Sequence, residues 1–187
     1  MEVASTASTA STSSAALVSP VEDVGAAHHR IAVFGSGMFG TALATCLARN
    51  GHSIKLLTRN PVVCESINTK HVNPVVLSSF TLPDSIVATL SAEEALADCE
   101  YIVHVIPVQA SPEYLLRLRH LIPPHVPIIS ASKGIHAERL QYMSDLVPAV
   151  LERDQPTAYL SGPSFAKGIE RTPTQQRAKR SMLRYLS

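Results

Sequence analysis

The sequence has few of the features that mark membrane, nucleic-acid or zinc-binding proteins. No apolar run approaches the roughly 18 residues that a membrane-spanning helix needs, so we expect no membrane partner. The formal net charge of +1 gives no sign of a nucleic-acid partner. The three cysteines are scattered without C-x-x-C or Cys/His spacing, which predicts reduced thiols and no metal site. With 187 residues, 45% of them hydrophobic, the chain fits one soluble α/β domain.

Residues 1–29 contain no lysine or arginine and are rich in Ala, Ser and Thr. Such a segment cannot bury enough apolar surface to fold, so we expect a disordered leader that includes His28 and His29. A Ser-rich, acid-poor leader is typical of organellar transit peptides. The acids Glu2, Glu22 and Asp23, with no arginine, argue against the mitochondrial kind. A plastid leader and a plain disordered tail both remain open.

Residues 31–40 carry the most informative motif, I-A-V-F-G-S-G-M-F-G. It is an apolar strand followed by G-x-G-x-x-G and a small-residue helix that we predict over 41–50. In the dinucleotide-binding pattern, Gly35 makes the sharp turn, Gly37 admits a pyrophosphate close to the backbone, and Gly40 lets the helix approach the sheet. The unpaired amides and the positive dipole end at the start of this helix would then favour the binding of an anion. A chance turn between strand and helix is the alternative.

Strand and helix patterns alternate along the rest of the chain. We predict further strands over 52–58, 86–89, 101–106, 127–130 and 157–160. We predict helices over 61–69, 91–97, 111–121 and 137–150, with a further turn from Ser164 and an irregular segment over 71–83. Asn60 and a Ser91–Glu94 capping box mark two helix starts. This alternation predicts a Rossmann-type α/β fold over 30–169, with a doubly wound, mainly parallel sheet.

Ligands of such sheets bind at the carboxyl ends of the strands. The five loops expected there are rich in Gly, Pro, Ser or polar residues and predict one shared site, formed by 35–40, 58–60, 107–109, 132–134 and 161–166. His104 lies inside an apolar strand, which favours a packed residue over a ligand.

Two basic residues are candidates in these loops. An NAD-selective domain of this kind carries an acid after the second strand, which binds the ribose 2′-hydroxyl, but here no acid appears until Glu65. Arg59 instead offers a planar set of donors suited to a 2′-phosphate, so NADP should be tolerated. Lys133 directly follows a strand and could meet a substrate carbonyl or phosphate. For both residues the alternative is a solvated surface side chain. Free amides near Ser164 would add an anion cradle.

The motifs V-F-G-S-G-M-F-G-T-A-L-A, V-I-P-V-Q, S-A-S-K-G-I and L-S-G-P-S-F-A together resemble the NAD-dependent glycerol-3-phosphate dehydrogenase family. The resemblance implies NAD as cofactor, reversible reduction of dihydroxyacetone phosphate to sn-glycerol 3-phosphate, and a homodimer. It implies that Lys133 is catalytic and contacts cofactor and substrate, and that Gly162 and Ser164 contact the substrate. With Arg59 included, the expected cofactor-binding residues are Gly35, Ser36, Gly37, Met38, Phe39, Gly40, Arg59, Pro107, Lys133 and Ala166.

The segments C-E-S-I-N and H-V-I-P-V-Q look closest to the plastid branch of that family, which favours a plastid location over the cytoplasm. After L-S-G-P-S-F-A the family continues with a helical domain that supplies a second lysine, expected to act as general acid. Here a divergent basic tail follows over 170–187. We therefore expect a truncated form that binds cofactor with little or no turnover, because removal of a general acid costs roughly 10²–10⁴-fold in rate.

Three other interpretations stay open. The chain could be a non-catalytic NAD(P)-binding module that associates with a full-length subunit. It could belong to another dehydrogenase class with a helical second domain, such as the ketopantoate or 6-phosphogluconate type. The tail over 170–187 could also be an interaction peptide for acidic surfaces.

Overall fold

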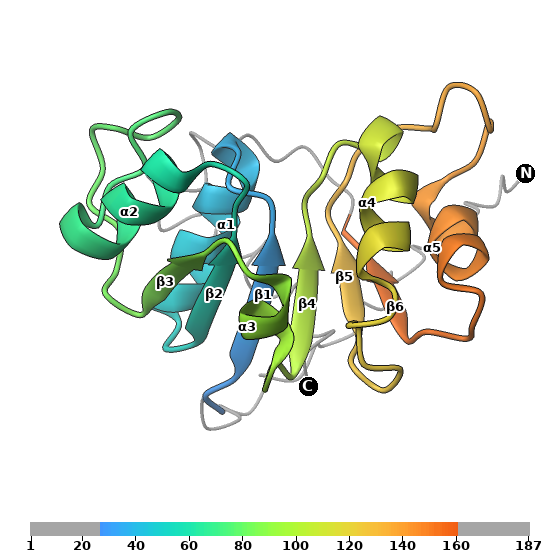
Figure 1. Cartoon of the computed structure of the whole chain (residues 1–187), viewed down its shortest axis with the longest axis horizontal. Coiled ribbons are helices and arrows are strands. Elements are labelled where there is room, and N and C mark those ends of the chain that lie inside the picture. The colour runs from blue at the N-terminus through green and yellow to red at the C-terminus, as the bar shows by residue number, and fades with distance from the viewer. Residues whose placement is uncertain (1–26, 161–187) are drawn as a thin grey trace, which may run out of the picture.

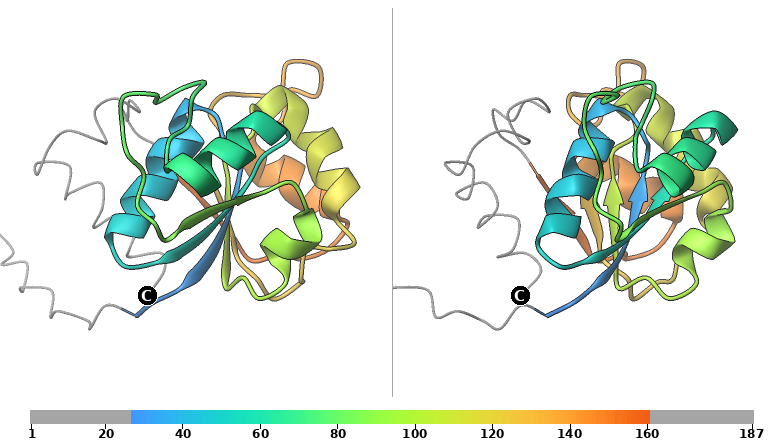
Figure 2. Two further views of the ribbon diagram at one scale, coloured as in Figure 1. Left: turned by 60° about the vertical axis from the view of Figure 1, so that its left-hand side comes forward. Right: turned by 90° about the vertical axis from the view of Figure 1, so that its left-hand side faces the viewer.

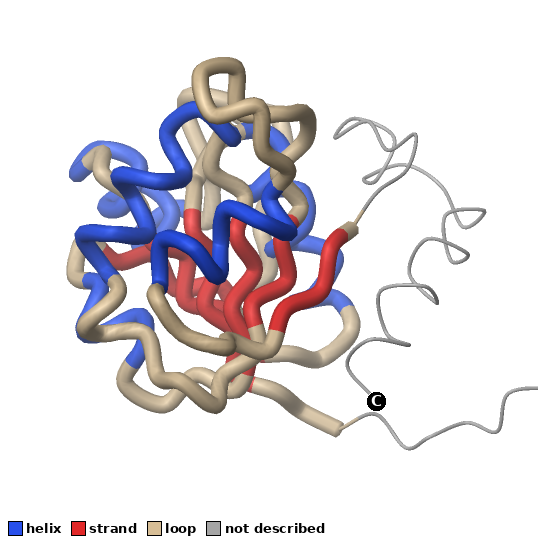
Figure 3. The backbone as a smooth tube through the Cα atoms, turned by 90° about the vertical axis from the view of Figure 1, so that its right-hand side faces the viewer, coloured by secondary structure: helices blue, strands red, loops and turns tan. Residues whose placement is uncertain are grey.

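Six short apolar segments pair side by side in the computed structural model, which describes residues 27–160 (Figure 1). All five pairings are parallel, and the strand order is β3-β2-β1-β4-β5-β6. The strands are β1 Arg30–Phe34, β2 Ser53–Leu57, β3 Ile86–Thr89, β4 Tyr101–His104, β5 Ile128–Ser130 and β6 Thr157–Tyr159. Figure 3 views the sheet from the β6 side. The order reverses between β1 and β4, which confirms the predicted Rossmann-type, doubly wound sheet.

Helices cover both faces of this sheet, and α1 and α4 lie on opposite sides of it (Figure 2). The α-helices are α1 Met38–Arg49, α2 Pro61–Lys70, α3 Ala92–Leu96, α4 Ser111–Leu118 and α5 Met143–Leu151, with a short 3-10 helix, η1, at Val108–Ala110. None of the helices within 27–160 has both the length and the apolar character needed to cross a bilayer.

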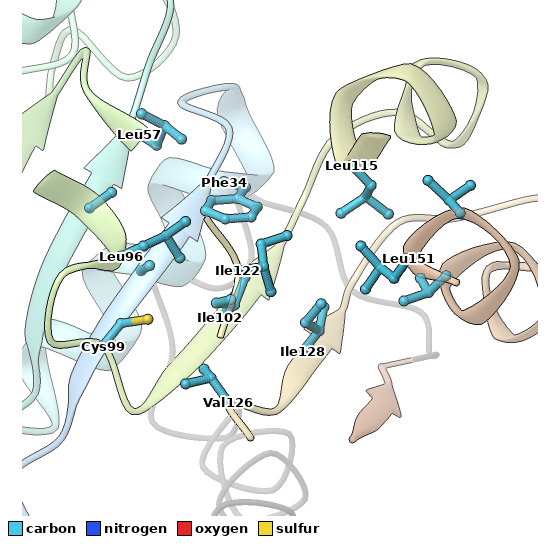
Figure 4. Packing of buried hydrophobic residues seen from close by; sticks show 14 of the residues in the cluster. Phe34, Leu57, Leu96, Cys99, Ile102, Leu115, Ile122, Val126, Ile128 and Leu151 are labelled. Atoms are coloured by element: carbon cyan, nitrogen blue, oxygen red, sulfur yellow. The ribbon is translucent and has the colours of Figure 1, made fainter. Parts of the chain in front are cut away.

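Successive side chains of each strand point to opposite faces of the sheet, which divides the core into two layers. In β1, Ile31 and Val33 pack with residues of α1 and α2, whereas Phe34 packs with residues of α3, α4 and α5. The second layer is seen in Figure 4, where Phe34, Ile102 and Ile128 point from the strands toward side chains such as Leu115. Because both faces are covered, the strands are almost continuously apolar in sequence.

Two predicted helix starts are present, one of them only in part. The Asn60 side chain accepts from the backbone N–H of Val62 at 2.9 Å and so caps α2 as predicted. The Ser91 hydroxyl accepts from the N–H of Glu94 at 3.0 Å. The Glu94 carboxylate, however, turns away from Ser91 and binds Thr89 and Lys55, at 2.6 and 2.8 Å. A charged partner on the neighbouring strand therefore replaces the return bond of a full capping box.

The helix predicted over 137–150 is wrong in its first half, because α5 begins only at Met143. The preceding residues form a loop closed by a bridge between His136 and Gln141, with Leu140 at a φ of 51°. The side chain of Gln109 bonds to the backbone of this loop, at Ile135 and Ala137. These tertiary bonds hold the loop in a non-helical conformation despite its apolar spacing.

His28 and His29, which the sequence assigned to the leader, instead pack against the domain. The His29 ring lies 5.1 Å from the Tyr101 ring and 5.5 Å from that of His52, measured between centroids. The His29 carbonyl accepts from the N–H of Ser53 at 3.0 Å, and the His28 ring contacts the Gly51 carbonyl oxygen. The folded part thus begins before Arg30, while residues 1–26 lie outside the described residues.

His104 is a packed residue, as predicted. It is completely buried at the end of β4, and its Nε2 lies 2.9 Å from the hydroxyl of Ser111 at the start of α4. The Ser111 hydroxyl also bonds to the Pro107 carbonyl at 3.1 Å, so a neutral imidazole that donates through Nε2 completes the chain of hydrogen bonds. Burial lowers the pKa of His104 to about 4.

This burial predicts that the domain loses stability as the pH falls. An unfolded histidine titrates near 6.5, so between about pH 6.5 and 4 the unfolded state takes up a proton that the folded state excludes. The loss attributable to His104 is about 3 kcal/mol over that window. Urea denaturation at pH 7.5 and pH 5 measures the free energy of unfolding of the wild type and of His104→Asn. This free energy should fall less between the two pH values in the variant than in the wild type. His125→Asn, at an exposed position, is the control, and an equal slope in all three proteins would contradict the prediction.

Candidate functional site

The carboxyl ends of the parallel strands meet at one edge of the sheet, the upper edge in Figure 1. Four of the five predicted loops lie there within the described residues, following β1, β2, β4 and β5. The fifth, with the predicted substrate and cofactor contacts Gly162, Ser164 and Ala166, lies outside the described residues. The structure therefore assembles most of the predicted loop cluster at the point where the strand order reverses.

Two glycines of the loop after β1 are required by close backbone contacts. Gly35 has a φ of 107°, and a side chain there would meet the Val105 carbonyl oxygen at 3.1 Å. At Gly40 an added Cβ would lie only 1.9 Å from the Gly35 carbonyl oxygen. The first turn of α1 therefore rests directly on the end of β1, which any side chain at Gly40 would prevent.

The start of α1 is suited to an anion. Gly37 is the N-cap residue of α1, and no side chain of the described residues bonds to the amides at this end of the helix. The first turn of α1 contains no acidic residue. The helix begins at Met38, earlier than the predicted Thr41, because the Thr41 N–H already bonds to the Gly37 carbonyl at 2.9 Å. At Gly37 an added Cβ would have no atom within 4 Å, so the space beside these amides is open. Uncapped amides, open space and the positive end of a helix dipole fit the diphosphate of a dinucleotide.

The loop after β2 lies beside the glycine loop. The hydroxyls of Ser36 and Thr58 are 2.6 Å apart, so this Ser36 side chain is engaged within the protein. Arg59, the next residue, is exposed, and within 27–160 its guanidinium makes no hydrogen bond or ion pair. It follows β2 at the place where a Rossmann-type domain binds the ribose of the adenosine. Its five donors can therefore meet a phosphate there.

Lys133 is brought to the glycine loop from the opposite side of the strand reversal. Its ammonium nitrogen lies 5.2 Å from the centroid of the Phe39 ring, within the range of a cation–π contact. The two residues are predicted site residues from the loops after β5 and β1, and the fold places them together. The following residue, Gly134, has a φ of 96°, so the chain turns sharply immediately after the lysine.

Hydrogen bonds from neighbouring loops fix the Lys133 segment. The Ser132 hydroxyl donates to the Ile106 carbonyl at 2.6 Å, next to the exposed predicted site residue Pro107. The Gln109 carboxamide donates to the Ile135 carbonyl and accepts from the Ala137 N–H, each at 3.0 Å. The loop after β4 thus clamps the loop after β5 on both sides of the lysine.

Two residues with direct contacts in the cluster were given no individual role by the sequence. Gln109 is one, although it belongs to the predicted loop over 107–109 and to the V-I-P-V-Q motif. The other is Asn73, a completely buried residue of the segment predicted as irregular, whose side chain bonds to the Ser36 carbonyl at 3.0 Å. The sequence predicted an irregular segment over 71–83, but nothing in it indicated which segment the Asn73 amide would reach.

Comparison with known proteins gives consistent results. The family described as NAD-dependent glycerol-3-phosphate dehydrogenase N-terminus matches residues 30–178. A chloroplastic glycerol-3-phosphate dehydrogenase [NAD(+)] of Arabidopsis thaliana is 40% identical over 140 residues, which is 73% of this chain and 33% of that protein. A glycerol-3-phosphate dehydrogenase [NAD(P)+] of Leptospira biflexa is 38% identical over 148 residues, covering 78% of this chain and 44% of the relative. The chain thus spans less than half the length of both relatives.

A solved structure shows the same fold. The crystal structure of glycerol-3-phosphate dehydrogenase from Coxiella burnetii superposes with a TM-score of 0.70 at 29% sequence identity. The superposition covers 76% of this chain and 43% of that one.

The contrast between Gly40 and Gly37 gives a prediction about folding. Replacement of a helical glycine by alanine normally stabilises a helix by about 1 kcal/mol. At Gly40 we expect the reverse, a loss of about 3 kcal/mol, because the new methyl group would collide with backbone. Gly37→Ala is the control, since φ is −68° there and the space is open. Urea denaturation measures both, and a Gly40→Ala protein as stable as the wild type would show that the contact is not rigid.

Proposed function

Because the chain belongs to the NAD-dependent glycerol-3-phosphate dehydrogenase family, we propose that residues 30–169 bind a nicotinamide dinucleotide. The observation that carries this proposal is the uncapped start of α1, which opens onto free space at Gly37 beside the Phe39–Lys133 pair. The amides of the first turn of α1 would bind the diphosphate. Met38 and Phe39, the first two residues of α1, would contact the dinucleotide.

Lys133 is proposed as the catalytic residue of this half of the site. The bound nicotinamide supplies or accepts the hydride. The Lys133 ammonium, beside the Phe39 ring, would bind an oxygen of the substrate and stabilise the negative charge that grows there as a carbonyl is reduced. The clamp from Ser132 and Gln109 would hold the lysine loop in place, which reduces the reorganisation needed when the substrate binds.

The proposed reaction is the reversible reduction of dihydroxyacetone phosphate to sn-glycerol 3-phosphate, which we infer from the family and from the printed names of the relatives. Gly162 and Ser164 would contact this substrate, and Ala166 the cofactor. A homodimer belongs to the same proposal. The described residues contribute the cofactor half of this chemistry.

We also propose a plastid location. The relatives from Arabidopsis thaliana and Oryza sativa are both chloroplastic, and the N-terminal 29 residues are rich in Ala, Ser and Thr. Bacterial relatives have comparable identity, so the plastid proposal rests on the chloroplastic relatives together with the N-terminal residues.

The plastid location is tested by incubating the full chain with isolated chloroplasts. We expect a shortened product that is protected from added protease, and a chain that stays outside the chloroplasts would favour the cytoplasm.

The binding proposal is tested by titrating the full chain with NADH and with NADPH and following the cofactor fluorescence. The wild type should bind, and Gly37→Asp should bind neither cofactor, because a carboxylate placed in the open space repels the diphosphate. A folded wild type that binds neither cofactor would overturn the proposal. Reduction of dihydroxyacetone phosphate, assayed on the same sample, reports whether this chain turns over.

The role of Arg59 is tested in the same titration. We expect Arg59→Ala to weaken NADPH binding about tenfold and NADH binding less than about twofold, because only NADPH carries the 2′-phosphate that a guanidinium fork recognises. Arg49→Ala, at an exposed arginine in the last turn of α1, is the control. Equal losses for both cofactors would assign Arg59 a general electrostatic effect instead.

A further inference from the structure

Asn73 makes a buried connection between two loops that are far apart in sequence. It lies in the segment after α2, and its side chain reaches the glycine loop 37 residues earlier. Its amide nitrogen donates to the Ser36 carbonyl at 3.0 Å and to the Thr41 hydroxyl at 2.9 Å. Both hydrogens of the amide are therefore used, in a completely buried environment.

The direction of these bonds is fixed by the partners. The Ser36 carbonyl can only accept, and the Val75 N–H, which lies 3.1 Å from Oδ1 of Asn73, can only donate. The amide nitrogen must therefore face Ser36. The Thr41 hydroxyl accepts from Asn73 and donates in turn to the Ser36 carbonyl at 3.2 Å. Two donors thus hold one carbonyl oxygen.

Fixing the Ser36 carbonyl also fixes the N–H of Gly37. The two groups share one planar trans peptide, in which C=O and N–H point in opposite directions. Because the carbonyl points inward to the buried amide of Asn73, the Gly37 N–H points outward, toward the open side of the exposed Gly37. An amide aimed in this way is a donor for an anion.

The glycine loop needs such an external constraint. Gly35 and Gly37 flank Ser36, and glycine allows the backbone more conformations than other residues do. Without Asn73 the Ser36 carbonyl would keep, among residues 27–160, only its bond from Thr41, and the peptide could rotate more freely. We infer that Asn73 is a positioning residue for the dinucleotide diphosphate, acting through the Ser36–Gly37 peptide on the Gly37 N–H. This inference rests on the proposed function.

The experiment compares ligands with and without a diphosphate. NADH, ADP and adenosine are titrated against the wild type, Asn73→Ala and Thr41→Val. We expect Asn73→Ala to weaken NADH and ADP binding about 10- to 100-fold and to leave adenosine binding within about twofold, since one donor to a charged group is misplaced. Thr41→Val removes one donor to the Ser36 carbonyl without changing side-chain shape, so it should cause a smaller loss in the same direction.

Asn68→Ala is the matched control. The Asn68 carboxamide also makes two backbone bonds, to the Ala88 carbonyl at 2.9 Å and from the Ala88 N–H at 2.8 Å, but at the β3 edge away from the glycine loop. It should leave the affinity for all three ligands unchanged. In the ligand-free protein, the ¹H–¹⁵N resonance of Gly37 should shift in the Asn73 and Thr41 variants and stay in place in Asn68→Ala.

The outcomes separate this inference from the proposed function. A folded wild type that binds neither NADH nor NADPH overturns the proposed function. Wild-type binding that is retained in Asn73→Ala, or equal losses for ADP and adenosine, overturns the role of Asn73 while the function stands. If the Gly37 resonance keeps its position in both Asn73→Ala and Thr41→Val, the inference is overturned whatever the affinities are.

Discussion

The close approach of α1 to the end of β1 is the constraint on which the rest of the candidate site depends. A side chain at Gly40 would lie 1.9 Å from the Gly35 carbonyl oxygen, so only glycine lets the helix begin directly after the strand. This contact places the first amides of α1 at the edge of the sheet between β1 and β4. It also brings Phe39 within reach of Lys133, which arrives from the loop after β5.

Hydrogen bonds to backbone carbonyls hold the loops of this edge together. The Ser36 carbonyl accepts from Asn73 and Thr41, and the Ile106 carbonyl accepts from Ser132. A buried carbonyl without a donor is costly, so each of these bonds satisfies the backbone and fixes a loop at the same time. The exposed basic residues are then presented on loops whose backbone is already fixed.

Much of the fold was predictable because its causes are local. The apolar run of β1, the cap at Asn60 and the glycine spacing each act over a few residues, and the predicted strands and helix starts follow from them. The error at 137–142 has a different cause. Its apolar spacing favours a helix, but two bonds from Gln109, which lies 26 and 28 residues away, hold part of this segment as a loop. A local pattern cannot include a partner at that separation.

The sequence by itself determined the parallel sheet, the glycine loop and the family resemblance, because periodicity and short motifs encode them within single elements. Only the tertiary structure decided that Lys133 lies over Phe39, that Gln109 clamps the lysine loop, and that Asn73 holds the Ser36 carbonyl. The physical reason is that these contacts join loops that are far apart in the chain, most of them at the ends of strands. A parallel sheet brings such ends together at one edge, where their separation in sequence carries no information about their distance in space.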